Sequence, residues 1–187
     1  MKTKTNVKRM LLLTVILMCH CFFASSYSLI RQNLPLANNA VLSIYQDEKG
    51  YMWFGTYDGL HSYNGKDTEV FRMELNNELS LASNIVVKLA PSGKDFIWVS
   101  TSMGLSRFSI SGRTVTETYM QYKEVYHIAS DDEGNTVLVS TDGIISVYAP
   151  KEHTFHDVPT EWLKVSDVVT IWSVSYTHLT LPTILLV

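Results

Sequence analysis

A repeat of about 40 to 45 residues constrains this chain more than any other feature of its sequence. In each copy a glycine-containing turn precedes a short apolar run, and the run ends at a threonine. These threonines are 45 and 40 residues apart, at Thr56, Thr101 and Thr141. A period of this length, built from several short strands, is typical of the blades of a β-propeller. The sequence therefore predicts an all-β chain made of propeller blades.

The third copy departs from the other two at two positions. Trp53 and Trp98 occupy one place in the first two copies, and the alignment puts Leu138 there in the third. Gly143 comes one position earlier than the corresponding glycines. The tryptophans could be sugar-stacking platforms, but recurrence at one repeat position favours a role in core packing between blades.

Four short strands are expected in each blade, and blades are expected at 40–80, 81–121 and 122–163. In the first blade the strands are predicted over Ala40–Ile44, Tyr51–Thr56, Leu60–Tyr63 and Asp67–Met73. The outer strand of the second blade is predicted over Thr114–Tyr119, because β-branched residues favour strands. No apolar period of 3.6 residues is sustained anywhere, so no helix is expected within the repeats.

A fourth copy begins at residues 164–172. Asp167 lies five residues before Trp172, just as Asn84 lies five residues before Leu89. We therefore expect an incomplete propeller of three blades and one strand. Propellers close with roughly 4–8 blades, and stacked repeats share their cores. We expect this chain, expressed without further blades, to aggregate or fold poorly. A cooperative thermal transition in a monomeric sample would contradict this expectation.

The first 26 residues have the layout of a secretory signal peptide. Four basic residues precede an apolar run over Leu11–Phe23, and Ala24 and Ser26 have the spacing that signal peptidase reads. An uncleaved anchor or a buried N-terminal helix is the alternative. Cleavage after Ser26 would remove both cysteines, Cys19 and Cys21. A lead-in segment at 27–39 would then open the mature chain.

Residues 173–187 differ from the rest of the chain. The stretch Val174–Thr183 resembles the in-frame translation of a transposase adapter used in sequencing libraries, and residues 173–187 contain no Asp, Glu, Lys or Arg. We interpret these residues as an adapter-derived tail, which implies that the native gene continues. A native apolar strand is the alternative.

The charge of the chain argues against a nucleic-acid partner. The formal net charge is −3, from 15 basic and 18 acidic residues. The signal peptide carries four of the basic residues and no acidic ones, which leaves −7 for the mature part. An acidic chain lacks the basic surface that binds phosphates. No apolar run reaches the 18 residues of a simple membrane span.

The segment Gln46–Leu60 closely resembles the propeller repeat of two-component regulators, and Ile97–Thr101 resembles it more weakly. The resemblance covers about residues 29–172. Such repeats are typical of hybrid sensor histidine kinases of Bacteroidetes. The resemblance implies a periplasmic sensor propeller in a dimeric, membrane-spanning receptor, followed by kinase, receiver and DNA-binding parts. Receptors of this kind commonly detect products of glycan breakdown.

Motifs for catalysis are absent: there is no nucleophile elbow, P-loop, dinucleotide fingerprint or zincin helix. We therefore assign no catalytic residue, no metal and no cofactor. His153 and His156 could in principle bind a metal, but residues three apart on a predicted outer strand point to opposite faces. We expect both to face solvent. Asp131–Asn135 resembles an acidic calcium loop, but its spacing is wrong and its place in the repeat predicts a hairpin turn.

Ligand-binding residues cannot be assigned from the motifs. Tyr57, Asp58 and His61 lie beside loops at which a propeller could bind a ligand, and they are weak candidates.

Two classes of function remain. The first is the exported sensory propeller of an inner-membrane sensor kinase, which binds a small molecule or an oligosaccharide and shifts between signalling states. The alternative is part of a secreted propeller enzyme, such as a lyase, or of a free-standing glycan-binding protein. A third possibility is that this stretch has no activity of its own.

Overall fold

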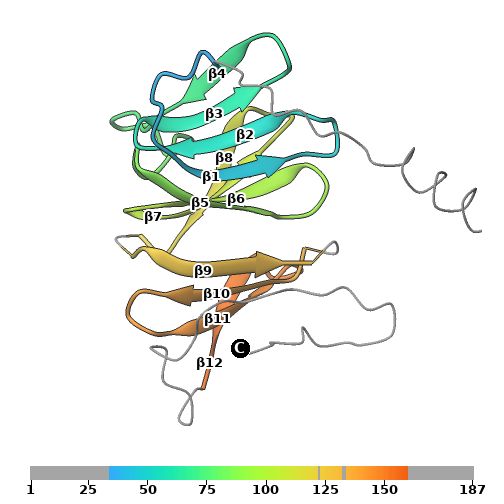
Figure 1. Cartoon of the computed structure of the whole chain (residues 1–187). Coiled ribbons are helices and arrows are strands. Elements are labelled where there is room, and N and C mark those ends of the chain that lie inside the picture. Colours follow the sequence, from blue (N-terminus) through green and yellow to red (C-terminus); the bar gives the residue numbers. More distant parts are fainter. Residues whose placement is uncertain (1–33, 122, 132–133, 160–187) are drawn as a thin grey trace, which may run out of the picture. The chain divides into compact units, whose positions relative to one another are not determined.

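In the computed structural model, residues 34–121, 123–131 and 134–159 are described, and they form twelve β-strands and no helix (Figure 1). The strands make three antiparallel sheets of four strands each, in which neighbours in sequence are neighbours in the sheet. The prediction of an all-β chain with propeller blades is confirmed. The expected signal peptide (1–26), the start of a fourth blade (164–172) and the adapter-like tail (173–187) lie outside the described residues.

Each sheet has the four antiparallel strands of a propeller blade. Blade 1 contains β1 (Val41–Gln46), β2 (Met52–Thr56), β3 (Gly59–Tyr63) and β4 (Thr68–Phe71). Blade 2 contains β5 (Val86–Pro91), β6 (Phe96–Thr101), β7 (Gly104–Ser109) and β8 (Thr114–Tyr119). Blade 3 contains β9 (Val125–Ser130), β10 (Thr136–Ser140), β11 (Ile145–Ala149) and β12 (Thr154–Val158).

The first hairpin turn shows why the sequence folds this way locally. The Asp47 carboxylate accepts hydrogen bonds from the backbone N–H groups of Lys49 and Tyr51, both at 2.9 Å. Gly50 has a φ of 85°, a backbone conformation that costs glycine little. The other oxygen of Asp47 accepts a hydrogen bond from Trp53 Nε1 at 2.9 Å. One aspartate therefore closes the turn and orients the tryptophan of the next strand.

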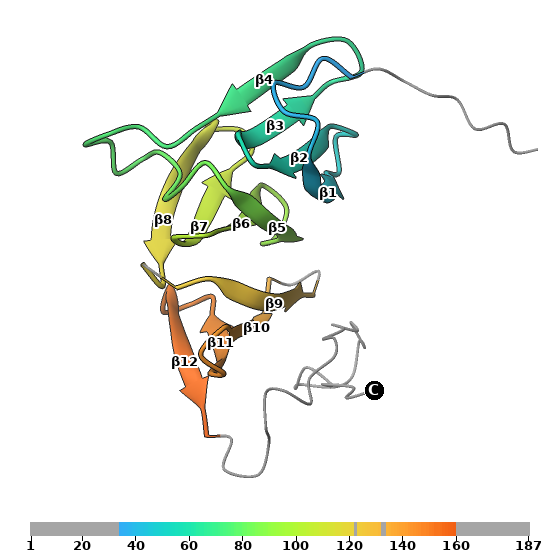
Figure 2. The ribbon, with the colours of Figure 1, turned by 60° about the vertical axis from the view of Figure 1, so that its left-hand side comes forward.

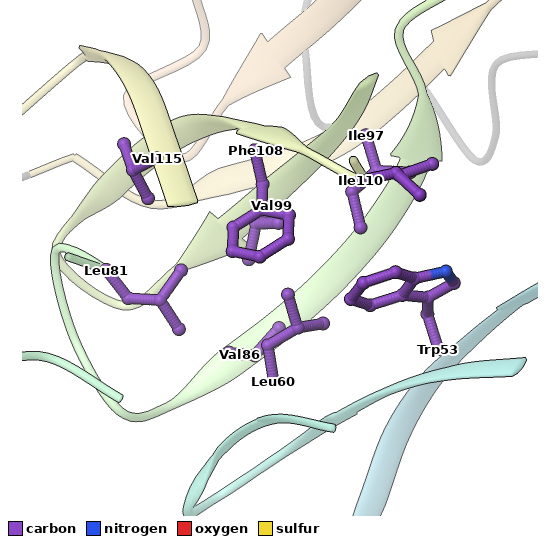
Figure 3. Close-up of a cluster of buried hydrophobic side chains, with 9 residues drawn as sticks. All are labelled: Trp53, Leu60, Leu81, Val86, Ile97, Val99, Phe108, Ile110 and Val115. Atoms are coloured by element: carbon purple, nitrogen blue, oxygen red, sulfur yellow. The ribbon is translucent and has the colours of Figure 1, made fainter. Parts of the chain in front are cut away.

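The first core cluster lies between blades 1 and 2. Figure 3 shows Trp53 and Leu60 of blade 1 pointing toward the aliphatic and aromatic side chains of blade 2. The Trp53 and Phe108 rings meet edge to face at a centroid distance of 5.6 Å. Such an edge-to-face pair adds stabilisation beyond the burial of its area.

The second core cluster lies between blades 2 and 3 and centres on Trp98. Its ring meets those of Tyr148 at 4.9 Å and Phe155 at 5.4 Å. Trp98 Nε1 donates to Thr136 Oγ1 of blade 3 at 2.8 Å. Trp53 and Trp98 are both fully buried, so the prediction that these tryptophans pack between blades is confirmed.

The predicted alignment of the third copy is wrong by one residue. In blades 1 and 2 the hydroxyls of Thr56 and Thr101 donate to the carbonyls of Gly59 and Gly104 across a two-residue turn. In blade 3 the equivalent donor is the hydroxyl of Ser140, not of Thr141, because the turn has three residues and closes on the Ile144 carbonyl at 3.2 Å.

That shift changes which residue of blade 3 takes the place of the tryptophan. Trp53 and Trp98 lie three residues before the turn-closing threonine, so their counterpart is Val137 and not Leu138. Leu138 instead faces blade 2 and packs in the cluster of Trp98. Val137 belongs to a third cluster with Val139 and Ile145.

Candidate ligand-binding site

The connection between blades 1 and 2 is longer than the connection between blades 2 and 3. Residues 72–85 join β4 to β5, whereas residues 120–124 join β8 to β9. Figure 2 shows the longer connection leaving β4 and returning to β5. Compact surface loops whose two ends lie close together frequently carry function.

Polar contacts hold both ends of this loop at the β2–β3 turn. Asn84 accepts the N–H of Met73 at its side-chain oxygen and the N–H of Gly59 at its carbonyl, both at 2.7 Å. Arg72 forms a paired contact with Asp58, with hydrogen bonds of 3.0 and 2.8 Å. The hydrogen bonds from Arg72 hold the pKa of Asp58 below its usual value. The loop therefore starts and ends at one fixed place.

Internal hydrogen bonds and one apolar anchor give the loop its shape. Ser80 receives the N–H of Glu74 at 2.9 Å and donates to the Asn77 carbonyl at 2.7 Å. Leu81 is 2% exposed and packs in the cluster of Trp53. The Leu79 carbonyl accepts the N–H of Val115 at 3.0 Å, which attaches the loop to the outer edge of β8.

A hollow of about 750 Å³ lies between this loop and β8. Met103, in the β6–β7 turn, forms part of its wall. Three carboxylates, three side-chain amides and three hydroxyls line it beside a few apolar side chains; the polar members are Glu74, Glu78, Glu117, Asn76, Asn77, Gln121, Ser80, Thr116 and Thr118. These oxygens and amides can exchange hydrogen bonds with a ligand that carries many hydroxyl or N–H groups.

Glu117 links the hollow to blade 3. Its carboxylate accepts the hydroxyl of Tyr119, contacts Arg107 at 3.6 Å and contacts His153 Nδ1 at 2.8 Å. Burial tends to raise the pKa of Glu117, but the hydrogen bonds from Tyr119 and His153 and the charge of Arg107 outweigh it and lower that pKa. Glu117 is therefore an anion throughout the neutral range.

The three weak ligand candidates fall in different environments. Tyr57 is 53% exposed at the β2–β3 turn, where it could meet a ligand. Asp58 is engaged with Arg72. His61 is wrongly placed by the prediction: it is fully buried on β3, where its Nε2 accepts the N–H of Ala37 at 3.2 Å. Its position in an alternating strand, facing the lead-in segment, removes it from solvent.

The two histidines of the proposed outer strand face solvent as predicted. Their side chains are 58% and 59% exposed, and each contacts a carboxylate at 2.8 Å, Glu117 for His153 and Glu152 for His156. Only His156 lies in β12; His153 occupies the preceding turn with a φ of 53°, because its N–H bonds back to the Ala149 carbonyl. No group of three or more metal-ligating side chains occurs among the described residues.

The described residues of the acidic segment, Asp131, Gly134 and Asn135, make contacts expected of the predicted hairpin turn. Asp131 accepts the N–H of Asn135 at 2.9 Å and its side-chain amide at 2.8 Å, and the Gly134 N–H donates to the Asp131 carbonyl. These bonds parallel those of Asp47 in blade 1. The side chain of Asp131 is used by its own turn.

The sequence motifs missed the residues of the hollow. The sequence feature that could have indicated the loop around the hollow is the uneven spacing of the repeat. The first pair of threonines is 45 residues apart and the second pair is 40 residues apart. The extra residues fall in the β4–β5 loop. Polar loop residues without a motif give no indication that they enclose a hollow.

A comparison with protein families finds one match, over residues 35–58, to the family described as "Two component regulator propeller". The match covers the end of the lead-in segment, β1, the Asp47 turn and β2. Blade 1 is therefore similar to the two-component regulator propeller repeat, as the sequence predicts. A comparison with curated proteins finds no match.

Solved structures with the same fold include two extracellular domains from B. thetaiotaomicron. One, described as part of a hybrid two component system, is 22% identical with a TM-score of 0.58 over 70% of this chain. The other, described as part of a one component system, is 19% identical with a TM-score of 0.57 over 79% of this chain. Virginiamycin B lyase from Staphylococcus aureus with quinupristin is 12% identical with a TM-score of 0.57, over 76% of this chain and 49% of the lyase. These likenesses show the propeller fold.

The chain spans only a fifth of the length of the two extracellular domains, 20% of each. Within the described residues, no helix is long and apolar enough to cross a membrane.

Proposed function

We propose that this chain is part of the exported, ligand-sensing propeller of a hybrid two-component sensor kinase anchored in the inner membrane. The observation that carries the proposal is the two-component regulator propeller repeat at residues 35–58. The extracellular domains with the same fold support an exported location. The chain itself is non-catalytic, and phosphoryl transfer belongs to later parts of the receptor.

The ligand in this proposal is derived from a glycan, and the hollow beside the β4–β5 loop contributes to its binding. The lining of side-chain amides, carboxylates and hydroxyls suits a neutral, hydroxyl-rich ligand. The three carboxylates and the absence of Lys and Arg from the described lining disfavour sulfated or uronic-acid oligosaccharides. Binding would shift the receptor between signalling states in proportion to its differential affinity for them.

A secreted propeller lyase is the second candidate, because virginiamycin B lyase has the same fold. The complete gene separates the two candidates. A membrane span and a kinase domain downstream of the propeller are expected for the sensor. A stop codon directly after the last blade would overturn the sensor proposal and favour a secreted protein.

Ligand binding is tested by thermal shift of the complete sensor domain with neutral and acidic oligosaccharides. We expect a neutral oligosaccharide to raise the melting temperature, as any ligand of the native state does. Thr118→Ala and Gln121→Ala should lose this shift, whereas Lys66→Ala, on the β3–β4 turn, should keep it. A shift that both lining variants retain places the ligand elsewhere, and no shift with any glycan contradicts the ligand class.

A further inference from the structure

Blade 3 carries an aliphatic cluster on the face that points away from blade 2. Val137 and Val139 of β10 and Ile145 of β11 form it, with Val147 packed against them. Among the described residues, no side chain from another blade belongs to this cluster. Leu138 and Tyr148, on the opposite face of the same sheet, pack against Trp98 of blade 2.

The other two blade interfaces follow one rule of packing. A tryptophan from the second strand of one blade meets an aliphatic residue from the first strand of the next blade. Leu89 of β5 packs against the cluster of Trp53, and Ile128 of β9 packs against the cluster of Trp98. At each interface the earlier blade therefore supplies a tryptophan, and the later blade supplies an aliphatic residue at the matching place of its first strand.

Blade 3 has no tryptophan in its second strand to offer to the blade that follows it. The residue in the place of Trp53 and Trp98 is Val137, which leaves a much smaller side chain to offer to the following blade. Dense packing at this face favours a larger residue at the matching place of the following blade.

The repeat pattern identifies that residue. In the three described blades a valine lies three positions before the aliphatic residue of the first strand, in the sequences VLSI from Val41, VVKL from Val86 and VYHI from Val125. The fourth copy reads VTIW from Val169. In this alignment Trp172 corresponds to Leu89 and Ile128, which pack against the preceding blade.

We propose that the segment Val169–Trp172 docks on the aliphatic cluster of blade 3 as the first strand of a fourth blade. Trp172 supplies from the following blade the indole that blade 3 lacks. The tryptophan has changed sides of the interface, and the two matching places still hold one large and one smaller side chain.

The chain length allows this arrangement. Ten residues separate Val158, at the end of β12, from Val169, and the connection from Tyr119 to Val125 needs only five. At roughly 3.3–3.6 Å for each extended residue, the longer connection reaches the neighbouring position easily.

A double-mutant cycle in the complete sensor domain tests the exchange. Val137→Trp and Trp172→Ile should each lower the urea midpoint, the first by overpacking and the second by leaving a cavity. Together they restore the arrangement of the other interfaces, so the double variant should recover much of the loss. Additive losses, as expected for residues that do not touch, would overturn the proposal.

Crosslinking reports on the same contact where the variants fold poorly. A bismaleimide that spans roughly 10 Å, the distance between packed sheets, should join Val137→Cys to Trp172→Cys within one chain in dilute solution. The control pair replaces Glu69, on β4 of blade 1, together with Trp172 and should not be joined. Equal yields for the two pairs, or no product from the first, would overturn the docking site.

Discussion

Asp47 illustrates how single residues hold these blades together. Its two oxygens accept two backbone N–H groups of the turn and the indole N–H of Trp53. It is 6% exposed, and a buried carboxylate needs such partners to offset its lost hydration. The turn and the core of blade 1 therefore depend on the same side chain.

Trp98 should be the most sensitive single position between blades 2 and 3. We expect Trp98→Ala to lower the free energy of unfolding by about 3–5 kcal/mol, because the indole is fully buried among three aromatic rings. Trp98→Phe keeps a ring but leaves Thr136 without its indole donor, and should cost less. Urea unfolding measures both. The exposed Tyr57→Ala is the control, and a Trp98→Ala loss as small as that of Tyr57→Ala would contradict the interface role.

His61 should make stability depend on pH. Burial lowers the pKa of His61, so the folded state disfavours the proton that the unfolded chain accepts near its usual pKa of about 6.5. The stabilising contribution is therefore present above that value and is lost as the pH falls below it. Protonation would also remove the Nε2 lone pair that accepts the Ala37 N–H.

Urea midpoints at pH 7.5 and 5.5 measure this dependence. His61→Leu should show a smaller drop on acidification than the unmodified protein. His156→Gln should keep the full drop, because the His156 side chain is 59% exposed. Equal drops in the His61 variant and the unmodified protein would show that His61 does not cause the dependence.

At the scale of strands and turns, the sequence predicted most of the blades. β8 coincides with the predicted Thr114–Tyr119, and the Asp47 and Asp131 turns lie where the repeat puts them. The shift in blade 3 could not be predicted, because Val137, Leu138 and Val139 are all apolar and suit either face. The hollow also escaped prediction, because it depends on how a polar loop folds back on β8.

Glu117 and His153 should couple the outer strand of blade 2 to the turn that precedes β12 in blade 3. Glu117→Gln and His153→Gln each remove the contact of 2.8 Å between them. We expect a coupling energy of about 0.5–1 kcal/mol in a double-mutant cycle, the scale of a partly exposed ion pair. Strictly additive effects of the two substitutions would show that this contact contributes nothing to the coupling of the two blades.

At the scale of the whole molecule, the cores belong to pairs of blades rather than to single blades. The cluster of Trp53 joins blade 1 to blade 2, and the cluster of Trp98 joins blade 2 to blade 3. Within a blade, hydrogen bonds between strands hold the sheet, but its faces are buried by its neighbours. Stacked repeats of this kind gain much of their stability from the interfaces.

Blade 2 should therefore be the most protected part of the described chain. It packs against a described blade on both faces, so opening it breaks two interfaces, whereas opening blade 1 or blade 3 breaks one of these two. Native-state hydrogen exchange should show the slowest amides in β6 and β7, and faster exchange in β2, β3, β10 and β11. Trp53→Ala should speed exchange in blades 1 and 2 more than in blade 3. Exchange at one uniform rate across all three sheets would instead indicate that the blades open only together, as a single cooperative unit.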